Sequence, residues 1–251
     1  MSEVVRVESI LNYLNRWAPP DTAEDWDNVG LLVGQADAPV TKVLTALEIT
    51  PSAVEQAAAM GAELIVSHHP VLFRLIMRLS GSHPVYHIAK HGMSAIAAHT
   101  NLDKAPGGVN DGLAARLGLK DVIPIMDGML RIGNMDVPVS PSDFVGHVVR
   151  SLGIPNGGIQ WADGGRPVKT VAVCSGAGGD CLDQLPCNID AFVTGELHYH
   201  EWPASPGHTI VAAGHYHTEV MIADLLAKRL ADAFPTIRVK AAEEKCPYNI
   251  Y

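Results

Sequence analysis

Histidines and carboxylates that can bind metal ions follow several short apolar runs of this 251-residue chain. His68 and His69 come directly after the run ELIVS, and the segment SAIAAHTNLD ends in Asp103. His215 and Glu219 follow HTIVAAG at i, i+4 spacing, which places two side chains on one face of a helix. Because imidazole and carboxylate groups are ligands of transition-metal ions, these five residues predict a metal site.

The number and type of these groups indicate two ions rather than one. Successive side chains on a strand point to opposite faces, so His68 and His69 are expected to bind different metals, or one metal and one ligand-orienting partner. Three imidazoles and two carboxylates suit Zn, Fe, Mn, Co or Ni better than Mg or Ca. Two divalent ions in one site activate water and polarise a substrate. Hydrolysis is therefore the reaction class that follows most directly.

Two histidines are candidate catalytic residues beside this ligand set. His99 is either a sixth ligand or a group that orients Asp103 or touches substrate. The segment DAFVTGELHYHE ends in Glu196, His198 and His200, which are expected to face the same cleft from the second lobe. Of these, we expect His200 to contact substrate or to donate a proton.

Two further patterns have a structural explanation at least as good as a functional one. His83, His87 and His91 are spaced i, i+4, i+8, but no carboxylate accompanies them, which favours a solvated or subunit-contacting helix face. The loop KAPGGVNDG after Asp103 could approach a phosphate through its glycine amides. A tight connection into the next helix explains the same glycines.

The elements that must position these residues follow one plan twice. In the first half, the strand pattern TKVLTALEIT precedes a helix with Thr50 as N-cap, Pro51 at its first position and Gly61 at its end, and the strands ELIVS and SAIAA follow. In the second half, VKTVAVCS, DCLDQLP, DAFVTGE and HTIVAA repeat strand, helix, strand, strand, and a last helix is expected from about residue 219 to 233.

We therefore expect an α/β fold of two similar lobes, with the dinuclear metal site in the cleft between them. The first lobe is expected over residues 1–123, the connection over 124–166, and the second lobe over 167–251. Residues 7–17 are predicted to form an amphipathic helix, because apolar residues recur there at helical spacing.

The composition narrows the class of protein. It is 47% hydrophobic and 18% charged, which is typical of a globular protein. The formal charge of −9 gives no general attraction to nucleic acid. No apolar run reaches the roughly 18 to 20 residues that span a bilayer. The first residues, MSEVVRVESI, lack the features of a secretory signal, so a cytoplasmic location is expected.

Several sequence blocks together resemble a known family. EDWDNVGLLVG, GAELIVSHHPVLF, AHTNLDKAPGGVNDGLA, VTGELHYHE and GHYHTE are similar, in the expected order, to the signature blocks of the Nif-three-like family. Its members are also described as dinuclear-metal-centre hexameric proteins or GTP cyclohydrolase I type 2 homologues. The resemblance covers essentially the whole chain.

This resemblance implies a role for each candidate ligand. His68 and His69 would each bind a different metal, Asp103 and His215 would complete the two sites, and Glu219 would bridge them. It also implies a homohexamer, a trimer of dimers, with the sites facing an internal cavity. The chain departs from the family pattern at Leu130, where a glycine is usual, and at His217, where relatives often have a small residue.

Three functions remain open at this stage. The resemblance favours a metal-dependent hydrolase acting on a nucleotide, with GTP ring opening as the named activity. The same metals could instead hydrolyse a phosphate ester. The alternative without turnover is a protein that stores or delivers metal ions. The chain has no Walker loop and no dinucleotide fingerprint that would decide among them.

Overall fold

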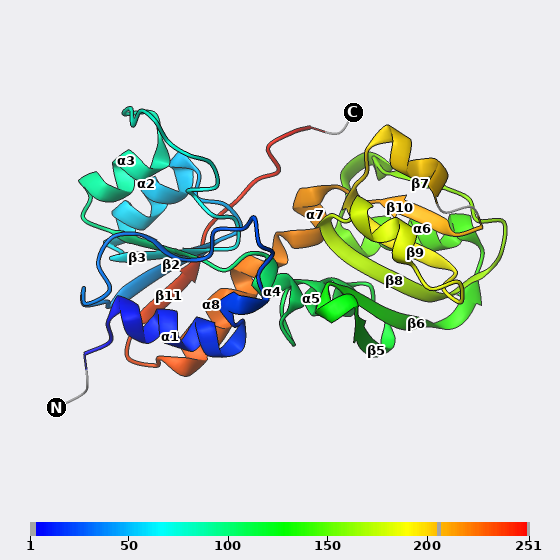
Figure 1. Cartoon of the computed structure of the whole chain (residues 1–251), viewed down its shortest axis with the longest axis horizontal. Coiled ribbons are helices and arrows are strands. Elements are labelled where there is room, and N and C mark those ends of the chain that lie inside the picture. Colours follow the sequence, from blue (N-terminus) through cyan, green and yellow to red (C-terminus); the bar gives the residue numbers. More distant parts are fainter. Residues whose placement is uncertain (1–3, 205–206, 250–251) are drawn as a thin grey trace. The chain divides into compact units, whose positions relative to one another are not determined.

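The computed structural model describes residues 4–204 and 207–249 of the chain. Its contacts divide the chain into two compact units, each with a sheet and helices packed on it (Figure 1). The first unit consists of the residues up to Ala105 together with Met221–Lys245. The second consists of Pro106–Val220 together with the residues from Cys246 onward.

The sheet of the first unit has the strand order β1-β4-β3-β2-β11. Strands β4, β3, β2 and β11 run parallel, and β1 pairs antiparallel with β4. Helices α2 and α3 cover one face of this sheet, and α1 and α8 cover the other (Figure 1). In chain order the elements of this unit are α1 (Val7–Trp17), η1 (Pro20–Thr22), β1 (Gly30–Val33), β2 (Lys42–Ala46), α2 (Pro51–Met60), β3 (Leu64–Ser67), α3 (Pro84–Lys90), β4 (Ser94–Ala97), α4 (Thr100–Lys104), α8 (Met221–Ala233) and β11 (Arg238–Ala241).

Local sequence signals account for the first helices of this unit. Helix α1 occupies residues 7–17 as predicted, and its apolar stripe Val7, Ile10 and Leu14 is buried. Helix α2 is also confirmed. The Thr50 side chain accepts a hydrogen bond from the Ala53 amide at its start, and Gly61 ends it with a φ of 67°.

The core between the sheet and α2 and α3 is built from short aliphatic side chains. Leu44 of β2, Ile65 of β3 and Ala95 of β4 pack against Val54 and Ile88 of the two helices. Strands β3 and β4 are buried along their whole length, and the sequence turns polar shortly after each of them ends. The histidines begin at those ends.

The sheet of the second unit has the strand order β5-β6-β8-β9-β10-β7. Strands β8, β9 and β10 run parallel, whereas the pairs β5–β6, β6–β8 and β10–β7 are antiparallel. The elements of this unit are α5 (Val109–Arg116), β5 (Lys120–Ile125), η2 (Met126–Gly128), β6 (Leu130–Val139), α6 (Pro141–Leu152), η3 (Pro155–Gly157), β7 (Gln160–Ala162), β8 (Val168–Ala177), η4 (Gly179–Gln184), β9 (Ala191–Glu196), η5 (Tyr199–Ala204), β10 (Thr209–Ala212) and α7 (His215–Glu219).

The two units share the mixed α/β plan expected from the sequence. In each, consecutive parallel strands lie side by side, as β2-β3-β4 in the first and β8-β9-β10 in the second. In each, an earlier strand pairs antiparallel with the last of them, β1 with β4 and β7 with β10. A 3-10 segment, η4, stands in the second unit where α2 stands in the first.

The units differ from the linear boundaries expected at 1–123, 124–166 and 167–251. The segment 124–166 is not a bare connection, because it supplies β6, α6 and β7 to the second unit. The last helix, expected from about residue 219 to 233, is α8 over Met221–Ala233, and it belongs to the first unit, whereas α7 ends at Glu219 in the second. Strand β11 then pairs with β2, which places the chain's late residues in the first sheet.

A buried ion pair holds the start of the second unit. Arg131 on β6 is 2% exposed, and its Nε lies 2.5 Å from Asp111 Oδ1 on α5. Its guanidinium also donates to the Gly128 carbonyl. Burial raises the pKa of Asp111, but the hydrogen bonds from Arg131 and the Gly107 amide and the charge of Arg131 together outweigh it and hold the pKa below the usual value. Neighbouring Leu130, the departure from the family pattern, is fully buried in the core of this unit.

Within the described part of the chain, none of the helices combines the length and the apolar character that crossing a membrane requires.

Candidate metal-binding residues

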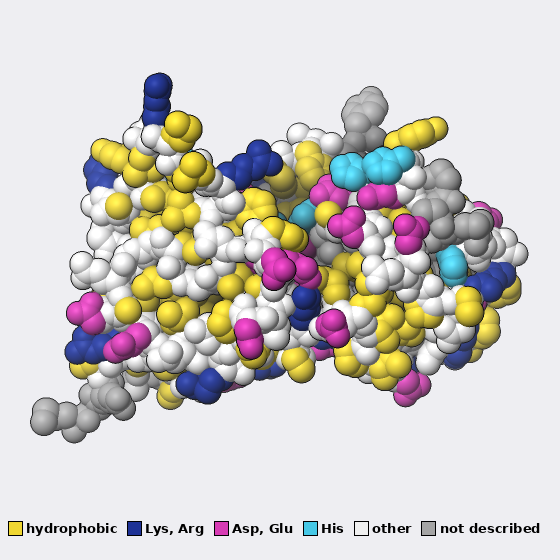
Figure 2. Space-filling view, viewed as in Figure 1, with side chains coloured by type: hydrophobic (Ala, Val, Ile, Leu, Met, Phe, Trp, Pro, Cys, Tyr) yellow, Lys and Arg dark blue, Asp and Glu magenta, His cyan; other side chains and the backbone are white. Residues whose placement is uncertain are grey.

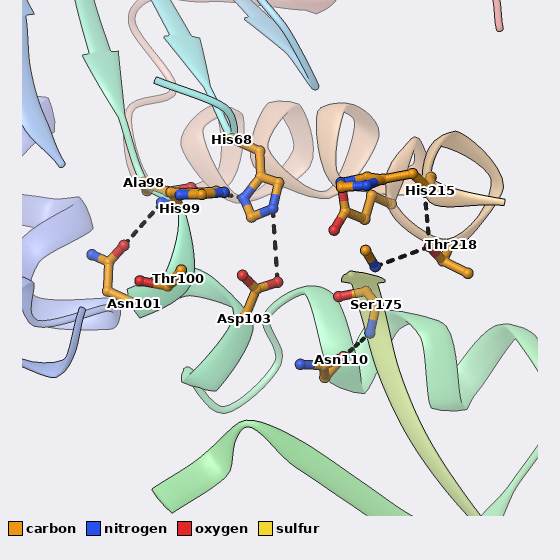
Figure 3. A network of polar contacts seen from close by, with 12 residues as sticks. His68, Ala98, His99, Thr100, Asn101, Asp103, Asn110, Ser175, His215 and Thr218 are labelled. Atoms are coloured by element: carbon orange, nitrogen blue, oxygen red, sulfur yellow. Dashed lines mark hydrogen bonds and ion pairs between the residues drawn. The ribbon is translucent and has the colours of Figure 1, made fainter. Parts of the chain in front are cut away.

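His68 continues the chain immediately past β3, and its backbone remains tied to the sheet. Its amide donates to the Ala46 carbonyl at 3.1 Å, and the amide of His69 donates to Leu47 at 2.8 Å. The His68 ring is fully buried, and its Nδ1 lies 2.9 Å from the Ala98 carbonyl oxygen (Figure 3). Since a carbonyl only accepts, Nδ1 carries the proton and Nε2 presents its lone pair.

The lone pair of His68 faces other candidate ligands of the first unit. Its Nε2 lies 3.7 Å from Asp103 Oδ1, and Asp103 is itself buried on α4 (Figure 3). His68, His69 and His99 each offer a ring nitrogen, and these atoms all lie within 4.8 Å of one another. Such a group has the spacing and donor type that a transition-metal ion requires.

His99 is held by a carboxylate that is not among the predicted site residues. Its Nδ1 lies 2.8 Å from Asp27 Oδ1, and Asp27 Oδ2 accepts from the Thr100 amide at 3.0 Å and the Thr100 hydroxyl at 2.6 Å. Burial raises the pKa of Asp27, but the hydrogen bonds from His99 and Thr100 outweigh it and keep the carboxyl ionised. Asp27 therefore fixes the tautomer of His99, so that Nε2 is the nitrogen that His99 offers to the group of His68, His69 and His99.

The second unit holds His215 and Glu219 on the short helix α7. His215 Nε2 lies 3.0 Å from Glu219 Oε2, and its Nδ1 lies 2.8 Å from Glu196 Oε1 at the end of β9. Burial lowers the pKa of His215, but the hydrogen bonds with Glu219 and Glu196 outweigh it and raise the pKa to about 9. A cation that binds this Nε2 must therefore displace a proton.

A glycine at the end of β8 allows this pair to lie close against the backbone. Gly176 at the end of β8 has a φ of 63°, and a Cβ added there would overlap Glu219 Oε1 and lie 3.1 Å from His215 Nε2. The same residue donates its amide to the Thr218 hydroxyl at 3.2 Å, and that hydroxyl donates to the His215 carbonyl at 2.8 Å (Figure 3). The backbone of β8 therefore holds α7, and because residue 176 has no side chain, the two candidate ligands pack directly against it.

Comparison with known proteins gives the family. The model of the Duf34/NIF3 (NGG1p interacting factor 3) family matches residues 5–247. The chain belongs to the Duf34/NIF3 family. A "GTP cyclohydrolase 1 type 2 homolog" of Clostridium perfringens is 30% identical over 96% of this chain and 98% of its own length. A protein of the same name from Streptomyces coelicolor is 31% identical over 90% of this chain and 85% of its own.

Solved structures agree with the fold of this NIF3-family protein. The crystal structure of a hypothetical protein from Staphylococcus aureus superposes with a TM-score of 0.91 at 27% identity, and the match covers 98% of this chain and 99% of that one. A Bacillus cereus protein related to NIF3 superposes with a TM-score of 0.90 at 21% identity over the whole of both chains, which bears on the fold alone.

The other histidines that the sequence singled out lie in different surroundings. In this NIF3-family protein His200 is exposed, and its ring stacks on that of His198 with centroids 5.6 Å apart. A pocket of about 170 Å³ on the same unit is lined by Asp180, Glu196, His198 and Glu201 among others, and Figure 2 shows acidic and histidine side chains gathered on this unit. His200 does not line that pocket.

The row His83, His87 and His91 flanks and enters helix α3 without forming a ligand group among the described residues. His83 is the N-cap and accepts from the Val85 amide at 3.2 Å, and His87 Nε2 donates to the Gly81 carbonyl at 2.6 Å. His91 is the exposed C-cap. These histidines therefore make local contacts at the ends of α3.

Two carboxylates beside the candidate ligands had only weak sequence signals. Asp27 lies in the block EDWDNVGLLVG, which the family resemblance marked but no spacing rule explained. Glu196 was expected near the site, and the structure gives it a defined partner in the Nδ1 of His215. Carboxylates that orient ligand imidazoles are a recurrent feature of metal sites.

Proposed function

We propose that this NIF3-family protein is a metal-dependent hydrolase that holds two divalent cations. The ligands of the proposed site are His68, His69, Asp103, His215 and Glu219. The observation that carries the proposal is the set of partners of two imidazoles. His68 and His215 each have Nδ1 against an oxygen acceptor and Nε2 toward a carboxylate. That pattern is the one that metal-binding histidines adopt.

The residues present fit a divalent transition metal. The donors are imidazole nitrogens and carboxylate oxygens, which suit Zn, Fe, Mn, Co or Ni. Asp103 is 8% exposed and Glu219 is 3% exposed, and buried carboxylates are costly unless a cation or a hydrogen-bond donor compensates them. Gly176 lets the Glu219 carboxylate and the His215 ring take their positions, because a side chain there would overlap Glu219 Oε1.

We propose that the ligands of the two units act together, in a cleft between the lobes. The support is the repeated plan: Asp103 follows His99 by four residues after β4, and Glu219 follows His215 by four residues after β10. Each unit thus provides histidine and carboxylate at the carboxyl ends of parallel strands, where ligands of α/β folds bind. A shared site would use a carboxylate from each unit to balance two dications.

When bound, the two cations would activate water and polarise the electrophilic centre of the substrate. His99 is the residue we assign to proton transfer. Its Nδ1 proton is held by Asp27, so its Nε2 can accept a proton and release it again while the ring keeps its orientation. His200 is proposed to contact substrate, which its exposure permits.

The substrate is proposed to be a purine nucleotide, GTP, because the curated relatives bear the name "GTP cyclohydrolase 1 type 2 homolog". Hydrolysis would open the imidazole ring of guanine at C8 and release that carbon as formate. The protein with its metals restored should release formate from GTP, measured by a coupled formate assay. His69→Gln should lose both metal and formate release, whereas His91→Gln, a change at the exposed end of α3, should lose neither.

Other outcomes of the same experiment select the alternatives. Turnover of generic phosphodiesters without formate release from GTP would indicate a phosphoesterase. Metal that exchanges freely, with no turnover of either substrate, would indicate a protein that stores or delivers metal ions. Elemental analysis of the purified protein, done first, identifies the ion with which both assays are run.

We also propose that the protein is a homohexamer, a trimer of dimers, as the family resemblance implies. Large apolar side chains exposed on one segment support subunit contacts, because Leu75 is 91% and Met77 is 89% exposed. Sedimentation velocity of the purified protein tests this. A monomer at micromolar concentration would contradict it.

A further inference from the structure

Two exposed aromatic side chains lie beside His99 in the first unit. Trp26 is 62% exposed and Phe73 is 49% exposed. Their ring centroids lie 5.9 Å apart with the ring planes at 83°, so a planar ligand ring that stacks on one of them meets the edge of the other. The two centroids lie 6.2 Å and 6.0 Å from the centroid of His99. The His69 ring lies 5.5 Å from that of His99, so the aromatic pair adjoins the candidate ligand group.

The pair is held in place although it is exposed. Trp26 precedes Asp27, whose carboxylate is fixed by His99 and Thr100. The Asn28 side chain donates to the carbonyl of Leu72, next to Phe73. These bonds tie the loop that carries Trp26 to the loop that carries Phe73. Large apolar rings that a protein fixes in position but leaves uncovered are typical of a binding surface rather than of loose chain.

The charges that border this pair differ between its two rings: Trp26 is flanked by Glu24, Asp25 and Asp27, whereas basic residues follow Phe73. The segment that follows the candidate ligands, PVLFRLIMRLS, contains Arg74 and Arg78 and no acidic residue. The chain as a whole has a formal charge of −9, so this stretch departs from the overall balance. A planar ring that carries phosphates would stack at Trp26 and Phe73 and direct its phosphates toward the arginines of the Phe73 segment, away from the carboxylates around Trp26.

We infer that Trp26 and Phe73 form a stacking platform for the planar heteroaromatic ring of the substrate, a purine base of a nucleotide. This inference rests on the proposed function, since it supplies the recognition of the nucleotide that the metals would act on. It assigns specificity for an aromatic base to residues that are neither ligands nor proton carriers. Aromatic rings bind bases through their faces, and this contact does not require a hydrogen bond to any base edge.

Equilibrium binding of guanosine to the metal-loaded protein tests the platform without any need for turnover. Trp26→Ala should weaken guanosine binding about tenfold, and Phe73→Ala should act in the same direction, as expected for the loss of one stacked ring. Trp26→Phe should retain most of the affinity because a ring remains. Bound guanosine should quench tryptophan fluorescence in the wild type and quench it much less in Trp26→Phe.

The controls separate this platform from a structural role and from the hydrolase proposal. Metal content should stay unchanged in every variant, and Trp161→Phe, at an exposed ring of β7, should change neither affinity nor quenching. Guanosine binding that depends on Trp26 without formate release from GTP would support the platform and contradict the hydrolase.

Equal guanosine affinity in the wild type and Trp26→Ala, or no binding to either, would overturn the platform. A changed sedimentation coefficient in Trp26→Ala with unchanged affinity would assign the surface to subunit contact instead, and would also overturn it.

Discussion

The Nδ1 atom of His99 lies 2.8 Å from Oδ1 of Asp27, which stands 72 residues earlier in the chain. The other oxygen of that carboxylate accepts two hydrogen bonds from Thr100. Asp27 thus joins the loop before β1 to the start of α4, and it does so through the side chain that faces the candidate ligands. The pair gives His99 one tautomer and one orientation, which proton transfer at Nε2 requires.

Replacing Asp27 should impair the chemistry more than metal binding. In Asp27→Asn the amide cannot accept from both His99 and Thr100, so the His99 ring loses its fixed orientation. We expect turnover to fall by about 10- to 100-fold, the usual effect of removing a partner that orients a functional histidine. Asp25→Asn, at an exposed neighbouring carboxylate, is the control. Unchanged turnover in Asp27→Asn would remove His99 from the proton-transfer role.

Glu219→Ala should lose both metal ions while the fold is retained. The side chain is buried and hydrogen-bonds with His215, and we propose that it bridges the two cations. Elemental analysis after gel filtration measures the metal content, and circular dichroism verifies the fold. Glu55→Ala, at an exposed position of α2, should keep both ions. Full occupancy of both positions in Glu219→Ala would show that the bridging role is wrong.

Much of the fold follows from short-range sequence signals. The apolar runs ELIVS and SAIAA predicted strands that end where the polar residues begin, and β3 ends at Ser67 directly before His68. Thr50, Pro51 and Gly61 predicted the ends of α2 because a cap is a local contact. The candidate ligands could be found for the same reason, since His68 and His69 directly follow β3, and Asp103, His215 and Glu219 lie on the short helices that come after β4 and β10.

The parts of the fold and of the site that the sequence did not predict depend on contacts between residues far apart in the sequence. Strand β11 pairs with β2, with Arg238 opposite Lys42, and no local pattern in either strand specifies that partner. The same holds for Asp27, whose function comes from a side chain 72 residues away. The segment 124–166 resembled a connection because glycine, proline and aspartate recur in it. Its strands are stabilised by pairing with β8 and β10, which composition does not reveal.

The Asp111–Arg131 pair predicts how stability depends on pH. The pKa of Asp111 is lower in the folded protein than in the unfolded chain, where aspartate titrates near ~3.9. Its contribution is therefore complete above the unfolded pKa and is lost as the pH falls through the folded value. The urea midpoint of the wild type should drop more between pH 6 and pH 3 than that of Asp111→Asn. Asp232→Asn, at an exposed position of α8, should follow the wild type, and parallel curves for Asp111→Asn and the wild type would contradict the prediction.

Gly176→Ala tests whether the close approach of His215 and Glu219 to the backbone of β8 is needed for metal binding. The added methyl group would overlap Glu219 Oε1, so we expect the metal content to fall although all five proposed ligands remain. The positive φ of Gly176 costs an alanine about 1 kcal/mol on its own, and that strain must be separated from the steric effect. Gly165→Ala provides the comparison, because Gly165 has a φ of 73° and an added Cβ there meets nothing within 4 Å. We expect Gly165→Ala to lose stability in urea through backbone strain alone and to keep its metal, whereas Gly176→Ala should lose more stability and also lose metal as measured by elemental analysis. Equal metal content in the two variants would mean that the positions of Glu219 and His215 against Gly176 are not needed for metal binding.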